Sequence, residues 1–251
     1  DSLLDGSRVR YLNLELEHRG LDLGGAVGRQ AARGGGVLGR FDGGRVDWRF
    51  QDRWRLTGVG GVPQDSSVAN SIETHRAFFG LDLAVDHVWD RFDAELYAIG
   101  QQVDGLTDRI GIGSQLRWID DIGSCFVALD YDAYYTSLNL AMLSGSLNVS
   151  DATTLSLLLD HRNSPFLTTS NALVGQAVGE IEDLKRSFST SEIEALAEDR
   201  TPTASTLMFG VTHQLDTRWQ IAGDFTATTL SDTSASGGVP AWEELGWEYF
   251  Y

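Results

Sequence analysis

The chain lacks the residues and runs that would support disulfide, helical-membrane or nucleic-acid-binding architectures. Its 251 residues include a single cysteine, Cys125, which excludes an internal disulfide. Mean hydropathy is -0.16, and no apolar run approaches the roughly 18 residues that mark a membrane helix. Lys and Arg together number 19 against 36 Asp and Glu, a formal net charge of -17. Because nucleic-acid phosphates require a basic face, nucleic acid is excluded as a partner.

Motifs for catalysis or for a cofactor are also missing. The five histidines have no metal-ligand spacing, and no serine lies in a nucleophile elbow. A hydrolase would need the fold to bring Ser156 or Ser164 to His161, and a solvated polar face explains these residues more simply. Asp120 with Asp121, or residues 231–238, would bind calcium weakly at most, because EF-hand spacing is absent. We therefore expect no enzyme and no resident cofactor or metal.

Alternation of apolar and polar residues is the dominant pattern in the chain. In RVRYLNLELE (8–17) the leucines have one parity and the polar residues have the other, which predicts a β-strand. Charges on the polar parity are too frequent for the core of a sandwich, and they suit a water-filled lumen. Roughly thirteen strands are predicted, near 7–17, 21–29, 44–51, 53–62, 74–86, 91–102, 109–118, 123–134, 138–147, 153–162, 202–213, 218–229 and 245–251.

The connections between these strands alternate in length. Longer or Gly-rich links are expected at one end of the strands and tight turns at the other, as in barrels of the bacterial outer membrane. The fold class predicted is thus all-β, an antiparallel transmembrane β-barrel. The tight turns fall near 17–20, 51–54, 87–91, 119–123, 148–152 and 215–219. The longer links fall near 29–43, 63–73, 103–108, 134–138, 163–201 and 231–244.

The strand count bears on the extent of the barrel. Residues 1–251 are expected to form a single barrel domain, since all-β domains of this length are common. Bacterial single-chain barrels usually have an even number of strands, so we expect about 14–16 in all. The last strand, GWEYFY, is shorter than the roughly 9–11 residues that cross a bilayer. We therefore expect the chain to be part of a longer one.

Tryptophans gather beside the tight turns. Trp54, Trp89, Trp118 and Trp219 lie there, and tyrosines 134–135 lie at a longer link. Such placement is typical of the aromatic girdles that contact membrane interfaces, with outer-membrane lipid as the partner. The alternative is that large aromatic residues simply close the ends of a β structure.

Residues 163–201 interrupt the β pattern and predict a helical insert. Apolar residues recur there at helical spacing, and a second helix begins with a capping box from Ser189 to Glu192. The apolar face must be buried, so the insert plugs the barrel as a constriction, caps its mouth, or docks a periplasmic or surface protein. The residues of this gate or docking face are Leu173, Val174, Val178, Ile181 and Leu184.

The Gly-rich, Arg-rich segment 28–44 is the most distinctive loop. It lacks the Lys-Ser/Thr ending of a phosphate-binding loop, so we expect a loop that folds inward. Its arginines would face carboxylates across the lumen and create a transverse field, or they would only brace the wall as ion pairs. The lumen and constriction candidates are Arg29, Arg33, Arg40, Asp42, Asp47, Asp82, Asp93, Glu95, Asp130 and Asp132.

Several stretches together carry a resemblance to a known group. They are GGVLGRFDG (35–43), VDGLTDR (103–109), ALDYD (128–132), DHRNSPFLTTSNALVGQ (160–176) and LAEDRT (196–201). In these the chain resembles the barrel region of large proteobacterial outer-membrane proteins. That group carries a periplasmic tetratricopeptide-repeat region before a C-terminal barrel, and its function is largely uncharacterised. This sequence contains no such repeat, so the resemblance concerns the barrel alone.

Three functions remain open at this point. The first is a conduit for a polar solute or polymer through the outer membrane, gated by the insert and selective through the charges of its lumen. The second is a plugged barrel that anchors a larger cell-envelope or surface complex. The third, a soluble β-sandwich or solenoid adhesin, fits poorly, because a soluble protein has no need of aromatic bands beside its turns.

Overall fold

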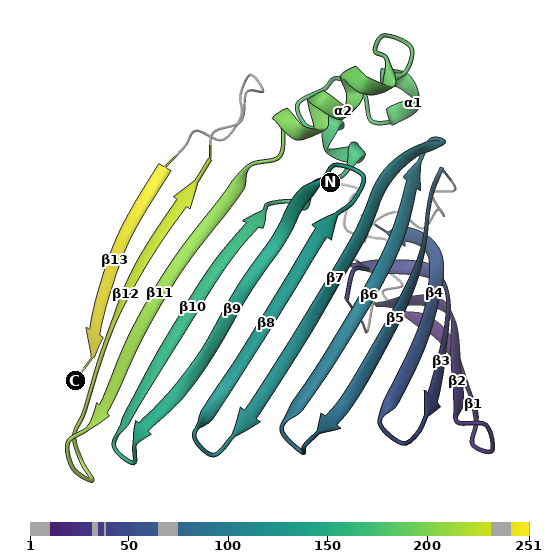
Figure 1. Cartoon of the computed structure of the whole chain (residues 1–251). Helices are drawn as coiled ribbons and strands as arrows, with labels where there is room; N and C mark the ends of the chain where they lie inside the picture. The colour runs from purple at the N-terminus through teal and green to yellow at the C-terminus, as the bar shows by residue number, and fades with distance from the viewer. Residues whose placement is uncertain (1–10, 32–34, 38, 65–74, 232–241, 251) are drawn as a thin grey trace, which may run out of the picture.

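Thirteen antiparallel strands form one curved sheet in sequence order, β1 to β13 (Figure 1). The computed structural model describes residues 11–31, 35–37, 39–64, 75–231 and 242–250. All thirteen strands predicted from the alternation are present, and the all-β antiparallel fold class is confirmed. Their bounds are β1 Leu12–His18, β2 Leu23–Ala31, β3 Arg40–Phe50, β4 Trp54–Gln64, β5 Arg76–Val88, β6 Phe92–Val103, β7 Leu106–Asp120, β8 Gly123–Asp132, β9 Ser137–Ser150, β10 Thr153–Asn163, β11 Thr203–Gln214, β12 Gln220–Leu230 and β13 Trp242–Phe250.

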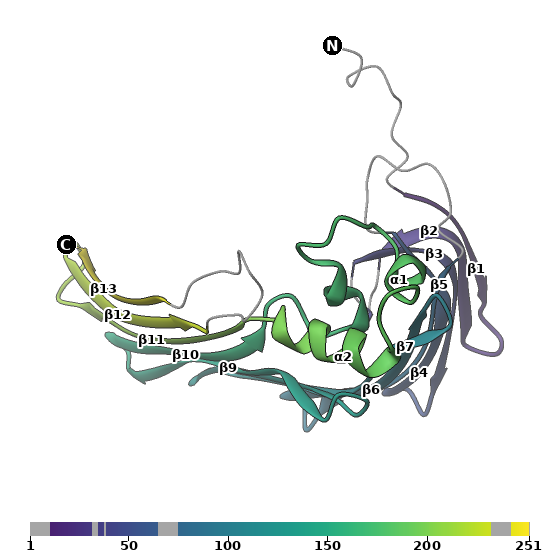
Figure 2. The same ribbon diagram turned by 90° about the horizontal axis from the view of Figure 1, so that it is seen from above.

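The sheet is strongly curved, and the segment between β10 and β11 lies on its concave side (Figure 2). Among the described strands, β1 pairs only with β2 and β13 only with β12, so these two are the edges of the sheet. The expected total of 14–16 strands stays a prediction. Within the same residues, no helix has the length and apolar character needed to span a membrane.

The convex face is apolar and exposed. Leu83 pairs with Leu56 on one side and with Leu96 on the other, so residues of one parity form rows across the strands. Leu96 is 59% exposed and Leu14 is 59% exposed, whereas Tyr97, the next residue on β6, is buried. A broad apolar surface of this kind is unfavourable in water and matches the hydrocarbon core of a bilayer.

The six tight turns lie together at one end of the strands, at the bottom of Figure 1, as predicted. Two of the longer links were wrongly predicted. The link at 103–108 is a two-residue turn, Asp104–Gly105, with both residues at positive φ, as expected for an Asp-Gly hairpin. The link at 134–138 covers only 133–136, where Asp132 accepts hydrogen bonds from the following backbone N–H groups. Polar residues next to both turns belong to the strands, so the alternation pattern placed the ends of the strands too far from the turns.

A row of glycines crosses β2, β3 and β4. Gly28 pairs with Gly43, which pairs with Gly61. A Cβ atom would lie 2.3 Å from the Leu12 carbonyl oxygen at Gly28, and 2.2 Å from the Gly60 carbonyl oxygen at Gly43. Without side chains, neighbouring backbones approach closely here and the strands can bend. Beyond this row, Gly35 and Gly36 lie against Tyr97 on the concave face.

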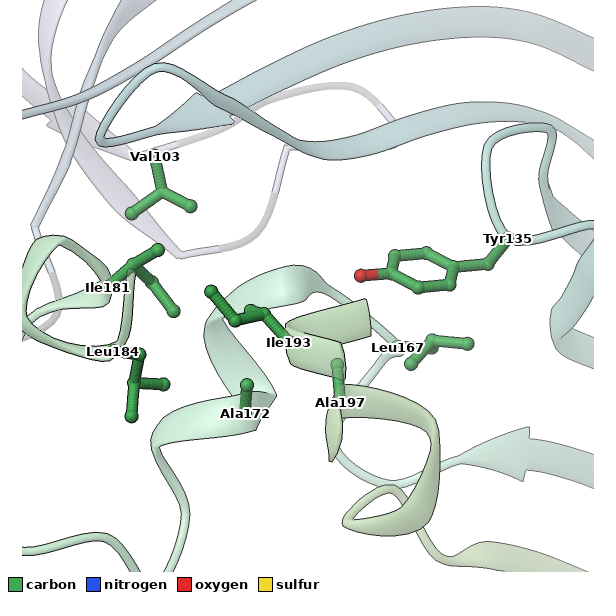
Figure 3. Close-up of a cluster of buried hydrophobic side chains, with 8 residues drawn as sticks. All are labelled: Val103, Tyr135, Leu167, Ala172, Ile181, Leu184, Ile193 and Ala197. Atoms are coloured by element: carbon green, nitrogen blue, oxygen red, sulfur yellow. The ribbon is translucent and has the colours of Figure 1, made fainter. Parts of the chain in front are cut away.

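The β10–β11 insert has its own small core. It contains a 3-10 helix η1 (Thr169–Leu173), a short α1 (Ile181–Leu184) and α2 (Thr190–Asp199). Ile181 and Ile193 are fully buried and lie among side chains from the β6–β7 and β8–β9 ends (Figure 3). The full cluster comprises Val103, Tyr135, Leu167, Ala172, Ile181, Leu184, Ile193 and Ala197.

The helical prediction for the insert was partly right. α2 begins at the expected capping box, with Ser189 as N-cap and Glu192 reaching back to it. The helical spacing expected over 173–184, however, does not form one helix. Gly175 adopts φ +73, and only four residues from Ile181 onward are α-helical. Gly at both 175 and 179 weakens a helix there, and the apolar residues reach the core from separate turns.

Candidate functional site on the concave face

A polar hollow of about 700 Å³ opens on the concave face along β1 to β5. Acidic and basic side chains from β1, β3, β4, β5 and the β1–β2 turn meet in it, so the face opposite the apolar one is charged and accessible. This supports the predicted assignment of charged parity to a lumen. Its charged lining residues are Glu15, Glu17, Asp22, Arg45, Asp47, Arg49, Arg55 and Asp82.

The strand register aligns polar residues in one row that starts in this hollow and continues past it. Asp47 pairs with Thr57, Thr57 with Asp82, and Asp82 with Tyr97. Across β7 the row continues to Asp130. Asp82 and Asp130 are both buried although they face the concave side. Gly35, between β2 and β3, lies close to Tyr97 and Glu95, the residues of β6 beside Asp82.

Arg109 on β7 joins three separate parts of the molecule. Its side chain is fully buried, forms an ion pair with Asp130, and lies 3.8 Å from Asp132. It also donates a 3.3 Å hydrogen bond to the carbonyl of Gly36 in the β2–β3 connection. The Phe166 ring of the insert lies 5.1 Å from its guanidinium carbon, at cation–π distance. The wall, the inward loop and the insert therefore meet on one guanidinium group.

Glycine makes room for this arrangement. A Cβ at Gly111 would lie 2.6 Å from Arg109 Nη2, and one at Gly113 would lie 2.2 Å from Tyr97 Cζ. On the other side of the ring, a Cβ at Gly35 would lie 2.2 Å from Tyr97 Cε1. The Tyr97 ring is thus held between glycines of the wall and of the loop, and its hydroxyl donates a 2.6 Å hydrogen bond to Asp130. The predicted inward folding of the loop is confirmed for residues 35–37.

The arginines predicted to line the constriction need correction. Arg29 forms a bidentate pair with Asp42, with both N–O distances 2.8 Å, and donates to Gln64 on β4. This cluster braces β2, β3 and β4 beyond the glycine row and is not part of the 700 Å³ hollow. Arg40 is the first residue of β3, and Arg33 lies outside the described residues.

Apart from Asp42, which shares the parity of Val46 on β3, the predicted acidic residues lie on the concave face, but in different settings. Asp47, Asp82, Glu95, Asp130 and Asp132 belong to the neighbourhood of the hollow and of Arg109. Asp93 lies near the tight-turn end, where Arg117 donates to it at 2.9 Å. The structure therefore brings five of these acidic residues together and leaves Asp93 apart.

The four predicted interface tryptophans all lie at the tight-turn end. Trp89 and Trp219 are exposed in turns, and Trp54 is 36% exposed at the start of β4. Trp118, near the end of β7, pairs with Phe92 across the strands. The tyrosines at 134–135 do not form the opposite girdle. They pack under the insert, because α2 and η1 supply both an apolar contact and polar partners for their hydroxyls.

Most residues of the predicted gate or docking face are buried in the insert core or pack against it. Ile181 and Leu184 are buried in its core, and Leu173 and Val178 pack against that core. Val174 is 53% exposed and is the exception. These residues fix the insert to the sheet and leave little apolar face for a partner.

Local sequence patterns carry only weak signals for Arg109, Tyr97 and Phe166. Arg109 and Tyr97 have the inward parity of their strands, and glycines at 111 and 113 share it. Proximity to Asp130 depends on the register of three strands, which alternation does not specify. Phe166 lies in an irregular segment, where no periodic pattern predicts the direction of its side chain.

The structure adds little to the weaker chemical hypotheses. His161 Nδ1 lies 2.9 Å from Ser205 Oγ, and alternation along β10 directs Ser156 to the opposite face. Within the described residues, no three potential ligand side chains are grouped as a metal site. Asp120 pairs with Arg91 at 2.7 Å, and residues 232–238 of the other candidate calcium loop lie outside the described residues.

Comparison with solved structures identifies the architecture. The outer membrane channel DcaP of Acinetobacter baumannii matches with a TM-score of 0.50 and 8% identity, over 90% of this chain and 71% of that one. The chain has the fold of an outer-membrane β-barrel. This fold agrees with the location in the bacterial outer membrane that the sequence predicted.

Other comparisons are weaker or negative. OmpT, an in-vitro folded outer membrane protein of Vibrio cholerae, matches with a TM-score of 0.41 and 10% identity, over 90% of this chain and 74% of that one. This likeness is too weak to support an inference. No protein-family model and no curated protein matches the sequence.

Proposed function

We propose that this protein is an outer-membrane channel that conducts a polar solute without covalent chemistry. The observation that carries the proposal is the contrast between the two faces of the sheet. The convex face is apolar and exposed, whereas the concave face holds a charged hollow of about 700 Å³. A sheet with these two faces separates lipid from a water-filled path.

The contacts around Arg109 support a narrow point along this path. The loop residue Gly36 and the insert residue Phe166 both reach the guanidinium group from the concave side. Carboxylates and guanidinium groups held at a narrow point act on a passing solute through a strong local field. Polar solutes would then be preferred over apolar ones.

Single-channel conductance of the full chain in planar bilayers tests the proposal. Phe166→Ala removes the ring over Arg109 and should raise the conductance, because it widens the narrow point without uncovering the insert core. Deleting the whole insert is a poorer test, because it would expose Val103 and Tyr135. Val174→Ala, at an exposed position of the same insert, serves as the matched control and should leave conductance unchanged.

The second candidate is a plugged barrel that anchors an envelope or surface complex. The fully buried core of the insert and the contact of its Phe166 ring with the buried Arg109 favour it, because both hold the insert against the wall. The resemblance to tetratricopeptide-associated barrels adds to this proposal, since such a protein would have periplasmic partners. Folded protein that is silent both before and after Phe166→Ala would support the anchor and contradict the channel.

A further inference from the structure

Asp82 on β5 is a buried carboxylate that hydrogen bonds satisfy only in part. It is 6% exposed and lines the polar hollow. Its two cross-strand neighbours both carry hydroxyls, but Thr57 donates to Asp47 at 3.0 Å and Tyr97 donates to Asp130 at 2.6 Å. Within the described part of the chain, Asp82 Oδ2 has no hydrogen-bond partner. Burying such a group is costly unless a positive charge or a donor meets it.

The arginines near Asp82 are engaged with other carboxylates. Arg45 on β3 lies 2.7 Å from Asp47, and Arg55 on β4 lies 4.0 Å from Asp86. No ion pair to Asp82 is formed by the residues that the structure describes.

The diagonal neighbour of Asp82 on β6, two residues before Tyr97, is also acidic. Glu95 accepts a hydrogen bond from the Gly35 N–H of the inward loop. The charged groups that face Asp82 are therefore Asp47 and Arg45 from β3, Arg55 from β4 and Glu95 from β6. The two arginines are paired elsewhere, so negative charge is in excess at this point.

We infer that Asp82 and Glu95 form a subsite for a monovalent cationic group on the concave face of the channel. The group is an alkali ion or the ammonium or guanidinium end of a solute. A divalent metal fits less well, because calcium takes six to eight oxygen ligands and no group of three ligand side chains is present among the described residues. The inference rests on the proposed channel function and adds a preference for cations to it.

Reversal potentials of the full chain under a KCl gradient test the inference. Wild type should prefer potassium over chloride, and Asp82→Asn should reduce this preference. Asp224→Asn is the matched control, because it removes the same charge from the concave parity of β12, far along the sheet from β5. Equal shifts in the two variants would overturn the inference, since they would indicate diffuse charge instead of a local subsite.

Block of the potassium current by methylammonium and by guanidinium distinguishes an alkali-ion subsite from one for organic cations. Asp82→Asn should weaken block about fivefold, which corresponds to about 1 kcal/mol for a unit charge at ~4 Å in water. Unchanged block and unchanged selectivity in folded Asp82→Asn would overturn the subsite, as expected if the carboxyl already carried a proton.

A failure of the proposed channel can be told apart from a failure of the subsite. If the folded protein does not conduct, thermal unfolding is measured in potassium, guanidinium and choline chloride at equal, low concentration. A ligand that binds only the folded state raises the unfolding temperature. A rise with a small cation that is lost in Asp82→Asn supports the subsite without a channel, and no difference between wild type and variant contradicts it.

Discussion

Placing a charge on the convex face should test the orientation of every strand. Leu157 lies at the middle of β10, is 37% exposed, and pairs with Gly145 on β9 and Phe209 on β11. Leu157→Arg would put a charge near the middle of the hydrocarbon layer, where it costs about 2–4 kcal/mol. The equilibrium constant for folding into lipid should therefore decrease by a factor of roughly 30 to several hundred.

The neighbouring residue provides a matched control. Ser156 is exposed on the concave side and pairs with Ser146 and Gly210, so an arginine there can reach water. Urea-induced unfolding from phospholipid vesicles measures both variants, and only Leu157→Arg should shift the midpoint strongly. Equal shifts, or a larger shift for Ser156→Arg, would refute the assignment of faces.

Three further predictions concern close packing and the insert. Gly113→Ala should lower the unfolding temperature, because its Cβ would meet the Tyr97 ring and a backbone oxygen, whereas Gly100→Ala, with no atom within 4 Å, should not. Ile193→Ala should destabilise the insert by about 2–5 kcal/mol, measured as faster limited proteolysis, whereas the exposed Val174→Ala should have little effect. Hydrogen bonds from Ser189 hold the pKa of Glu192 below its ordinary value of 4.5. Because this pKa is lower in the folded state, its stabilisation is present above pH 4.5 and is lost as pH falls below it, so proteolysis of the insert should accelerate in acid and Glu192→Gln should flatten that dependence.

Each of these predictions has a clear contrary result. Equal unfolding temperatures for the two glycine variants would show that the wall near Tyr97 yields easily. Unchanged proteolysis of Ile193→Ala would mean that the insert core contributes little to its order. An acid response identical in wild type and Glu192→Gln would exclude the capping box as its origin.

Alternation predicted the strands well because each strand has one apolar side, on the convex face, and one polar side, on the concave face. RVRYLNLELE and the later strands carry apolar residues at every second position, and a slip of one residue would turn all of them to the wrong side. The ends of the strands were less certain. The pattern predicts a longer link around the Asp104–Gly105 turn, because Thr107, Asp108 and Arg109 are polar residues inside β7.

Register accounts for most of what sequence could not supply at the site. Asp82, Asp130 and Asp132 could be placed on the polar parity by local pattern alone. The contact of Arg109 with Gly36 spans 73 residues, and local sequence carries no information about such a contact. The helical periodicity over 173–184 misled for a related reason, since packing against Val103 and Tyr135 outweighs local preference there.

The sequence by itself determined the all-β class, the thirteen strands, the tight-turn end and the location of the helical insert. These follow from local properties, namely period-two alternation, turn residues and a capping box, which act within a few residues of each other. The tertiary structure alone decided which charges meet, that Arg109 links the wall, the loop and the insert, and that Asp82 Oδ2 is left without a hydrogen-bond partner. Those features depend on cross-strand register and on the close backbone approach at Gly28, Gly43 and Gly61, where chain segments distant in sequence meet.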